Sequence, residues 1–291
     1  MRIDTHQHFW AINDTDYVWM GEEHAPLRRD FLPQDLQPLL AAAAIDGCVS
    51  VQARQMVEET RWLLELADRH RWIKAVVGWV PLVENAGEPW LGQFAQHPKL
   101  AGVRHVLHDE PDDDFILRGD FNAGIARLAG YGLVYDVLIF ARHLPQTIVF
   151  ADRHPNQPLV VDHIAKPRIR RDGFDHAWAA GIRELARRGQ VACKVSGMVT
   201  EVRDPDWDAE LLRPYFETVL EAFGPRRLMF GSDWPVCRLR AGYDDWVRTA
   251  EFLTAPLSSD ERQAFWGGNA ARVYGFAPAD CAAPHSTPTK Q

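Results

Sequence analysis

The chain has 291 residues, of which 46% are hydrophobic and 25% are charged, and its formal net charge is −8. The apolar share is large enough for a folded core, so a disordered chain is excluded. The acidic balance disfavours nucleic-acid partners and anionic membrane surfaces, and no apolar run approaches the roughly 20 residues of a membrane span.

The N-terminal segment and the cysteines indicate the compartment. The first ten residues lack the charged region and apolar stretch of a signal peptide. The four cysteines are too few for a disulfide scaffold, and none forms a CxxC pair that would indicate a thiolate zinc site. We therefore expect a cytoplasmic protein.

Short apolar, β-branched runs alternate with longer amphipathic stretches along the chain. The runs are continuously apolar, which is typical of parallel strands covered on both faces. Their starts lie about 25 to 45 residues apart, enough for a strand, a helix and two loops. The predicted strands span Arg2–His8, Asp46–Val51, Ile73–Val80, Leu100–Val106, Leu133–Leu138, Pro158–Ile164, Gln190–Val195 and Arg227–Phe230.

The stretches between these runs show helical patterning. In Glu58–His70 the apolar residues fall on one helical face. Gly189 and the Gly224-Pro225 pair are typical stop signals after two further helices. These helices are predicted over Phe174–Arg188 and Asp208–Phe223, and another follows the capping box of Ser258 and Glu261.

Eight strand–helix units predict a (β/α)8 TIM barrel, an α/β fold in one domain at residues 1–276. A doubly wound open sheet is the alternative, but its usual Gly-rich turn after the first strand is replaced here by His6-Gln7-His8. The excursion Phe9–Gln34 is expected to lie at the catalytic face of the barrel. Residues 277–291, rich in Pro, Ala, Ser and Thr, are expected to form a disordered tail.

Four polar side chains end predicted strands. His6 and His8 are two residues apart, so their side chains point to the same side of the first strand. His163 ends the sixth run, and Asp233 follows the last run in the motif FGSDWP. A closed barrel brings strand ends to one face, so we expect the four to converge. Taken singly, each has a structural alternative, such as a core Asp–His pair or a turn-starting Asp before Pro235.

Three imidazoles and one carboxylate form a donor set that suits a divalent transition metal, most simply zinc. Such a metal would lower the pKa of a bound water and polarise a carbonyl group. Without a metal, Asp233 remains a candidate general base on water, with His6, His8 and His163 orienting the reactants. The sequence contains no GxSxG elbow, so a serine-hydrolase mechanism has no support.

Together these motifs resemble the amidohydrolase superfamily. Within it the chain is similar to the metal-dependent-hydrolase branch that includes sugar lactonases, in particular the L-fuconolactonase and L-rhamnonolactonase group. The resemblance extends from residue 3 to residue 276. The matching segments are IDTHQHFW, VQARQ, GVRHVLHDEPD, VVDHIAKP, KVSGMVTE, MFGSDWPVC and GGNAARVYGF.

The resemblance implies a hydrolase that opens a sugar-derived lactone to the aldonic acid, with Asp233 as general base and acid. It also implies one metal ion at most. Two-metal members carry a carboxylated lysine or a Glu on strand four and histidines on strands five and six, whereas this chain has Arg104, His105 and Asp136 on strands four and five. Lactonases of this group resemble enzymes that work without a metal, so the ion is not required by the resemblance.

Polar and aromatic residues at the remaining strand ends are candidate substrate contacts. A polyol lactone needs donors and acceptors for its hydroxyls and one cation near the carbonyl oxygen. Arg54, Arg104 and Lys194 are the candidates for that charge, and two tryptophans are candidates for walls against the sugar ring. The predicted substrate contacts are Gln52, Arg54, Arg104, His105, His108, Lys194, Trp10 and Trp234.

Two alternatives in other functional classes stay open. One is a decarboxylase of an aromatic or unsaturated carboxylic acid on the same scaffold. The other is a non-catalytic barrel that binds a sugar acid. The oligomeric state stays open between a monomer and a homodimer, because the outer helix faces of a barrel look alike in both.

Overall fold

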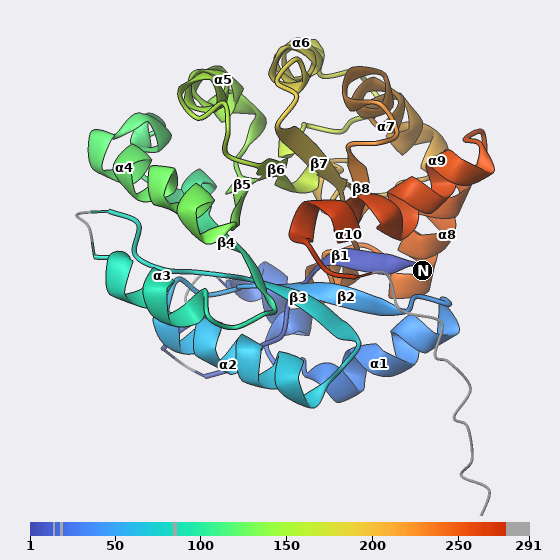
Figure 1. Ribbon diagram of the computed structural model, residues 1–291. Helices are drawn as coiled ribbons and strands as arrows, with labels where there is room; N and C mark the ends of the chain where they lie inside the picture. Colours follow the sequence, from blue (N-terminus) through green and yellow to red (C-terminus); the bar gives the residue numbers. More distant parts are fainter. Residues whose placement is uncertain (14, 18–19, 84–85, 278–291) are drawn as a thin grey trace, which may run out of the picture.

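Parallel strands and helices alternate along the computed structural model, which describes residues 1–13, 15–17, 20–83 and 86–277 (Figure 1). Within this part of the chain, the sheet order follows the chain order from first strand to last. The strands are β1 (Ile3–Gln7), β2 (Gly47–Val51), β3 (Ile73–Gly78), β4 (Leu100–Val106), β5 (Val134–Leu138), β6 (Leu159–Val161), β7 (Val191–Val195) and β8 (Leu228–Phe230).

Helices surround the strands on the outside of the sheet (Figure 1). They are α1 (Pro33–Ala42), α2 (Val57–Arg69), α3 (Glu88–Phe94), α4 (Gly119–Leu128), α5 (Leu144–Arg153), α6 (His176–Ala186), α7 (Ala209–Phe223), α8 (Tyr243–Thr254), α9 (Ser259–Gln263) and α10 (Asn269–Tyr274). None of the helices in the described part of the chain combines the length and the apolar character of a membrane span.

Bonds between β1 and the segment after β8 close the sheet into a barrel. Gln7 and Trp234 form a parallel bridge. The backbone N–H of His8 donates to the Trp234 carbonyl at 2.7 Å, and that of Asp233 donates to the His6 carbonyl at 2.7 Å. The predicted TIM barrel is therefore confirmed, and the open-sheet alternative is wrong.

Two apolar cores hold the barrel together. Each strand contributes to the inner one, which includes Ile3, Val77 and Met229. The outer core lies between strands and helices and contains most of the large aromatic side chains. Helix α10 lies across the amino-terminal end of the barrel, where its residue Tyr274 joins the inner core (Figure 1).

A bulge in β1 aims the two predicted histidines into the barrel. Three residue steps from Asp4 to Gln7 oppose only two steps on β2. Ile3 faces inward, so strict alternation would send His6 and His8 outward. The extra residue reverses the alternation, and the two imidazole rings meet inside with centroids 4.9 Å apart. The predicted shared side of these rings is confirmed.

The predicted elements differ from the observed ones mainly at their ends. The sixth strand stops at Val161 instead of Ile164, because the backbone turns left-handed from His163 onward. The sixth helix starts later than predicted, where Asp175 caps it through the Trp178 N–H. The predicted capping box is confirmed, since the Ser258 hydroxyl accepts from the Glu261 N–H. The predicted tail lies outside the described residues from residue 278 onward.

The excursion predicted at Phe9–Gln34 is anchored by its own aromatic contacts. Trp10 and Phe31 exchange backbone hydrogen bonds of 3.0 and 2.9 Å, and their rings pack edge to face. A short 3-10 turn, Glu22–Leu27, lies within the segment.

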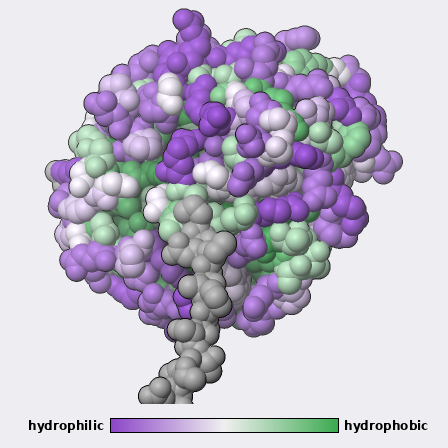
Figure 2. Space-filling model, turned by 45° about the vertical axis from the view of Figure 1, so that its right-hand side comes forward, coloured by the Kyte–Doolittle hydropathy of each residue, from purple (hydrophilic) through white to green (hydrophobic). Residues whose placement is uncertain are grey.

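The outer surface shown in Figure 2 is largely polar, with apolar residues between the polar ones. Among the described residues, the exposed large apolar side chains lie far apart along the chain, so they are scattered singly. They are Met56, Tyr131, Val149 and Phe252.

The indole of Trp246 joins α8 to the end of β8, because its Nε1–H donates to the Gly231 carbonyl at 2.8 Å in a buried position. Trp246→Phe leaves that carbonyl without its donor, so we expect a loss of about 1–3 kcal/mol in the free energy of unfolding. Urea unfolding measures it, with Val149→Ala on the exposed face of α5 as the control. Equal stability of both variants and the wild type would contradict the prediction.

Candidate active site

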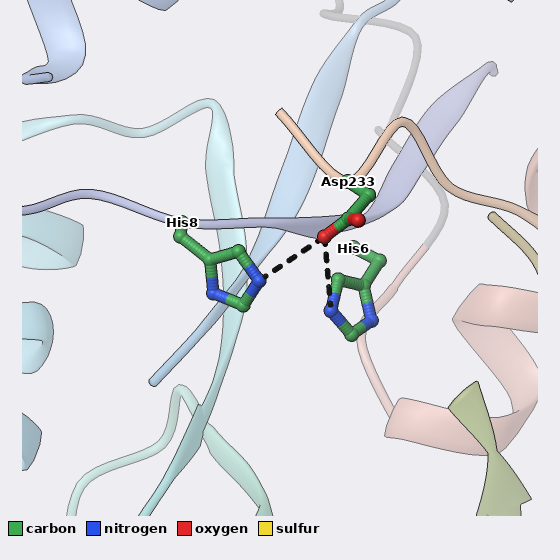
Figure 3. Close-up of side chains that lie close together, drawn as sticks. All are labelled: His6, His8 and Asp233. Carbon is green, nitrogen blue, oxygen red and sulfur yellow. Dashed lines mark ion pairs between the residues drawn. The ribbon is translucent and has the colours of Figure 1, made fainter. Parts of the chain in front are cut away.

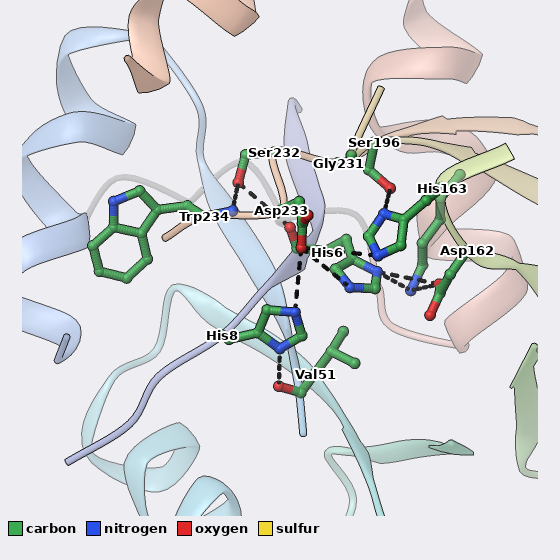
Figure 4. A network of polar contacts seen from close by, with 12 residues as sticks. His6, His8, Val51, Asp162, His163, Ser196, Gly231, Ser232, Asp233 and Trp234 are labelled. Carbon is green, nitrogen blue, oxygen red and sulfur yellow. Dashed lines mark hydrogen bonds and ion pairs between the residues drawn. The ribbon is translucent and has the colours of Figure 1, made fainter. Parts of the chain in front are cut away.

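The four predicted strand-end residues converge on one carboxylate oxygen, as expected. Oδ1 of Asp233 lies 3.4 Å from Nε2 of His8, 3.8 Å from Nε2 of His163 and 3.9 Å from Nε2 of His6 (Figures 3 and 4). All four residues are buried. This set, His6, His8, His163 and Asp233, is called the histidine cluster below.

The backbone around Asp233 is built to hold its side chain against the first strand. Asp233 has a left-handed backbone, with φ 58°. Its neighbour Ser232 donates its N–H to Asp4 Oδ1 at 2.8 Å, and the Tyr243 hydroxyl donates to the other oxygen of Asp4 at 3.0 Å. A Cβ at Gly231 would lie 2.8 Å from Cβ of His6, so glycine is needed for this close approach.

A left-handed turn after β6 positions His163. Residues His163, Ile164, Ala165 and Lys166 all have φ between 48° and 61°. Such a conformation costs roughly 1–2 kcal/mol per non-glycine residue, so the surroundings must hold it in place. The Trp178 Nε1–H donates to the Ile164 carbonyl at 2.6 Å, and the Lys166 N–H donates to the His163 carbonyl at 2.8 Å.

The second ring nitrogens show how the imidazoles are oriented. Nδ1 of His8 donates to the Val51 carbonyl at 2.8 Å, which leaves a lone pair on the Nε2 that faces Asp233 (Figure 4). Nδ1 of His163 lies 2.9 Å from the Ser196 hydroxyl. Metal-ligating histidines are held in this way, with the outer N–H on a carbonyl or polar partner. A carboxylate oxygen beside imidazole nitrogens whose outer nitrogens are held by polar partners is the arrangement of ligands in metal sites, so the cluster fits a metal ion.

Burial sets the charge of the cluster. Burial lowers the pKa of His163 to about 3 and that of His6 well below its ordinary value, so both rings are neutral near pH 7. Burial alone would raise the pKa of Asp233, but the facing imidazoles, His163 foremost, hold it well below the usual range. The cluster thus offers the neutral imidazoles of His6 and His163 and one carboxylate, and imidazole and carboxylate are ligands that zinc takes in proteins.

Two cations and two carboxylates lie beneath His6. Nδ1 of His6 donates to Asp162 Oδ1 at 3.1 Å, and Arg104 Nη1 donates to Nε2 of His6 at 3.2 Å and to Asp162 Oδ2 at 3.1 Å. Lys194 Nζ lies 2.5 Å from Asp136 and 3.1 Å from Asp162, with no exposed surface. The Tyr274 hydroxyl donates to Asp136 at 3.0 Å from the far end of the barrel.

This network bears on how many ions the site holds. Within the described residues, two groups have the spacing of a metal site: one is His6, His8 and Asp233, and the other is His6, Asp162 and His163. The carboxylate of the second group is already neutralised by Lys194 and Arg104. A second divalent ion there would meet two fixed positive charges, which disfavours its binding.

The structure separates the predicted substrate contacts into two groups. Gln52 and Arg104 lie next to each other beside the cluster, where Arg104 Nη2 donates to the Gln52 carbonyl at 2.5 Å. Arg54 follows β2, where it binds Glu59 and Asp16. His108 follows β4 and stacks on Phe140, with ring centroids 4.7 Å apart.

The other predicted contacts point away from the cluster. His105 lies on the outer face of β4, stacked on Phe115 and bonded to Glu110 at 2.6 Å, because successive strand residues face opposite sides. Trp10 and Trp234 have no exposed surface and pack on Phe31 in the outer core. Figure 4 shows the Trp234 indole directed away from Asp233.

Sequence reasoning missed Asp162 and Asp136 as parts of the site. Asp162 precedes His163 directly, and the pair appeared in the sequence only as a possible core contact. Asp136 on β5 pairs in register with Arg104 on β4. The signal that would have found it is an acidic residue inside an otherwise apolar, fully buried strand.

Comparison with known proteins agrees with this geometry. A family model described as amidohydrolase matches residues 3–276. The chain belongs to the amidohydrolase family. The resemblance found in the sequence is thereby confirmed.

Two relatives and one solved structure cover nearly the whole amidohydrolase chain. L-fucono-1,5-lactonase of Burkholderia multivorans is 44% identical over 298 residues, covering 96% of this chain and 98% of that protein. L-fucono-1,5-lactonase of Burkholderia ambifaria is 39% identical over 277 residues, covering 94% and 95%. A crystal structure of a Burkholderia multivorans amidohydrolase with bound zinc is 44% identical and covers 95% of this chain and all of that one, with a TM-score of 0.89.

Gly197 leaves room for His163. Its φ is 61°, and a Cβ there would lie 2.5 Å from Nδ1 of His163. Gly197→Ala must therefore strain the backbone or displace the imidazole, and we expect it to cost about 1–3 kcal/mol in the free energy of unfolding. Gly189→Ala is the matched control, because no atom lies within 4 Å of a Cβ at that position. Chemical denaturation of both variants tests this, and equal stability would refute it.

Proposed function

We propose that this amidohydrolase opens a sugar-derived lactone, similar to L-fucono-1,5-lactone, to its aldonic acid by attack of water on the carbonyl. The observation that carries the proposal is the buried Asp233 carboxylate facing three imidazole Nε2 atoms. Its support among known proteins is the relative named L-fucono-1,5-lactonase, which aligns over 96% of this chain.

In the proposed mechanism Asp233 acts first as a base and then as an acid. It accepts a proton as the water oxygen bonds to the lactone carbonyl carbon. The bond from that carbon to the ring oxygen then breaks, and Asp233 returns the proton to the ring oxygen. One molecule of water is consumed, and the product carries a new carboxyl group and a new hydroxyl group. The low pKa of Asp233 keeps the carboxylate ionised before water attacks, and the proton it then accepts is passed on to the ring oxygen.

Among the three predicted cations, Arg104 is the best placed to stabilise the oxyanion. Its Nη1 lies beside Nε2 of His6, the nitrogen that faces Asp233. Lys194 lies on the other side of the same ring, 3.2 Å from Nδ1, so we assign it to holding Asp162 and Asp136. Arg54 is engaged by two carboxylates, and we assign it to the wall of the site.

We also propose that the histidine cluster holds one divalent ion, with zinc as the first candidate. When bound, the ion would lower the pKa of a water molecule and polarise the lactone carbonyl. Support comes from the outer-nitrogen bonds of His8 and His163 and from the zinc found in the structure of a relative. The positive charges of Lys194 and Arg104 beside Asp162 disfavour a second divalent ion, so we propose a single one.

Replacement of Asp233 tests the reaction. Asp233→Asn removes the proton acceptor but keeps the shape, so we expect kcat/KM on aldonolactones to fall by about 10²- to 10⁴-fold. A panel of aldonolactones in a pH-indicator assay measures it, with the exposed Asp172→Asn as control. Retention of the wild-type rate by Asp233→Asn would overturn the mechanism.

Adding aromatic and unsaturated carboxylic acids and a sugar acid to the panel separates the alternatives. Release of carbon dioxide from an aromatic or unsaturated acid, without lactone opening, would select a decarboxylase. Thermal stabilisation by a sugar acid with no turnover of any lactone would select a binding protein. Release of acid from a lactone, stopped by Asp233→Asn, supports the lactonase.

Metal content is a separate test. We expect the wild type to bind one equivalent of zinc by elemental analysis, and His8→Ala to weaken binding by at least about 100-fold because it removes a ligand. The exposed His176→Ala on α6 is the control and should bind like the wild type. Two equivalents in the wild type would contradict the role given to Lys194 and Arg104. Assays before and after chelation then show whether the ion is needed for turnover.

A further inference from the structure

Side chains from four successive strand ends form a continuous row beside the histidine cluster. His108 follows β4, Phe140 follows β5, Lys166 follows β6 and Glu201 follows β7. His108 stacks on Phe140, the Lys166 ammonium lies 5.4 Å from the Phe140 ring centroid, and Lys166 Nζ lies 3.9 Å from Glu201 Oε1. Of this row, only His108 was predicted from the sequence.

Lys166 shares the strained turn that positions His163. The two residues are three apart in a run of left-handed backbone, and residues three apart lie on the same side of such a turn. The turn therefore presents an ammonium group beside the imidazole that faces Asp233.

The Lys166 ammonium has N–H donors that are available to bind a ligand. Its side chain is 19% exposed. Among the described residues, no hydrogen bond from Nζ is found, and its ion-pair partner is Glu201 at a distance too long for a direct hydrogen bond.

Glu201 is the matching acceptor. Its side chain is 8% exposed, and Arg203 Nη2 donates to its Oε2 at 2.9 Å, whereas Oε1 faces Lys166. Burial raises the pKa of Glu201, so a further hydrogen bond to Oε1 would stabilise the ionised carboxylate. Glu201 ends the turn Val199–Glu201, where the Thr200 hydroxyl donates to the Gly197 carbonyl at 2.8 Å, and Gly197 packs against the His163 ring, so the pair lies beside the histidine cluster.

We propose that Lys166 and Glu201 together recognise one ring hydroxyl of the substrate and so select hydroxylated lactones. The hydroxyl oxygen accepts from Lys166 Nζ, and its proton is donated to Glu201 Oε1. An oxygen about 2.8 Å from each atom spans a gap of 3.9 Å, which is the observed separation. The assignment rests on the proposed lactonase function and adds the basis of its substrate selectivity.

The test pairs two variants with two substrates. Lys166→Met and Glu201→Gln are assayed on a polyhydroxylated six-membered aldonolactone and on δ-valerolactone, which has the same ring without hydroxyls. We expect each variant to lower kcat/KM on the aldonolactone by about 10- to 100-fold and to leave the rate on δ-valerolactone near that of the wild type. Lys166→Arg, which keeps the charge and the donors, should recover part of the loss.

Control variants and a binding measurement make the outcome decisive. Lys74→Met, near the start of β3 at the other end of the barrel, should change neither rate. A parallel fall on both substrates would show a structural role, and no fall on either would also overturn the proposal.

If the wild type opens no lactone, calorimetry still tests the hydroxyl site. It measures binding of a 1,5-anhydroalditol, which carries ring hydroxyls, and of tetrahydropyran, which has the same ring without them. Loss of anhydroalditol binding in Lys166→Met would then support the hydroxyl site while the lactonase function fails. Equal binding by the wild type and Lys166→Met would refute the site as well.

Discussion

The structure depends on the seam where β1 meets the end of β8. Strand β8 has only three residues, so the seam is completed by the backbone of Asp233 and Trp234, which bonds to His6 and His8. The bonds that close the barrel are thus the bonds that bring the carboxylate to the imidazoles. Thr5 adds to the seam by donating its hydroxyl to the Phe230 carbonyl at 2.6 Å. Closure of the barrel and assembly of the site therefore depend on the same backbone bonds.

Charge balance under the cluster is the second constraint. Asp136 and Asp162 are fully buried, and a buried carboxylate is tolerated only when it is paired and hydrogen bonded. Lys194 bridges the two, and Arg104 adds a second cation against Asp162. The network leaves Nε2 of His6 directed at the mouth of the barrel. It also accounts for Lys194 inside the barrel, where the sequence alone suggests a group that reaches the substrate.

Much of the fold and part of the site could be predicted from the sequence, for identifiable reasons. Continuous apolar runs at regular spacing determine eight strands, and strand ends on one face bring His6, His163 and Asp233 together. The bulge in β1 could not be predicted from the sequence, because an extra residue reverses which side chains point into the barrel without changing the composition of the strand. The left-handed turn at 163–166 contains no glycine, so nothing local indicated it. Trp10 and Trp234 were placed at the substrate because adjacency along the chain does not reveal which side of a loop a ring faces.

Apart from Ala44, the non-glycine residues with a left-handed backbone in the described part of the chain lie at one side of the barrel mouth. The left-handed residues His163 to Lys166, Gly197 and Asp233 follow β6, β7 and β8, and all lie at or next to the histidine cluster. Strained conformations persist where surrounding contacts hold them and where a function requires the geometry. Relaxing the turn after β6 would gain stability but would move His163 away from Asp233 and Lys166 away from Glu201 together. One turn therefore sets both the distance from His163 to Asp233 and the distance from Lys166 to Glu201. A shift of this turn would move the imidazole beside the base and the proposed hydroxyl site together, which ties the position of the bound sugar to the position of the base.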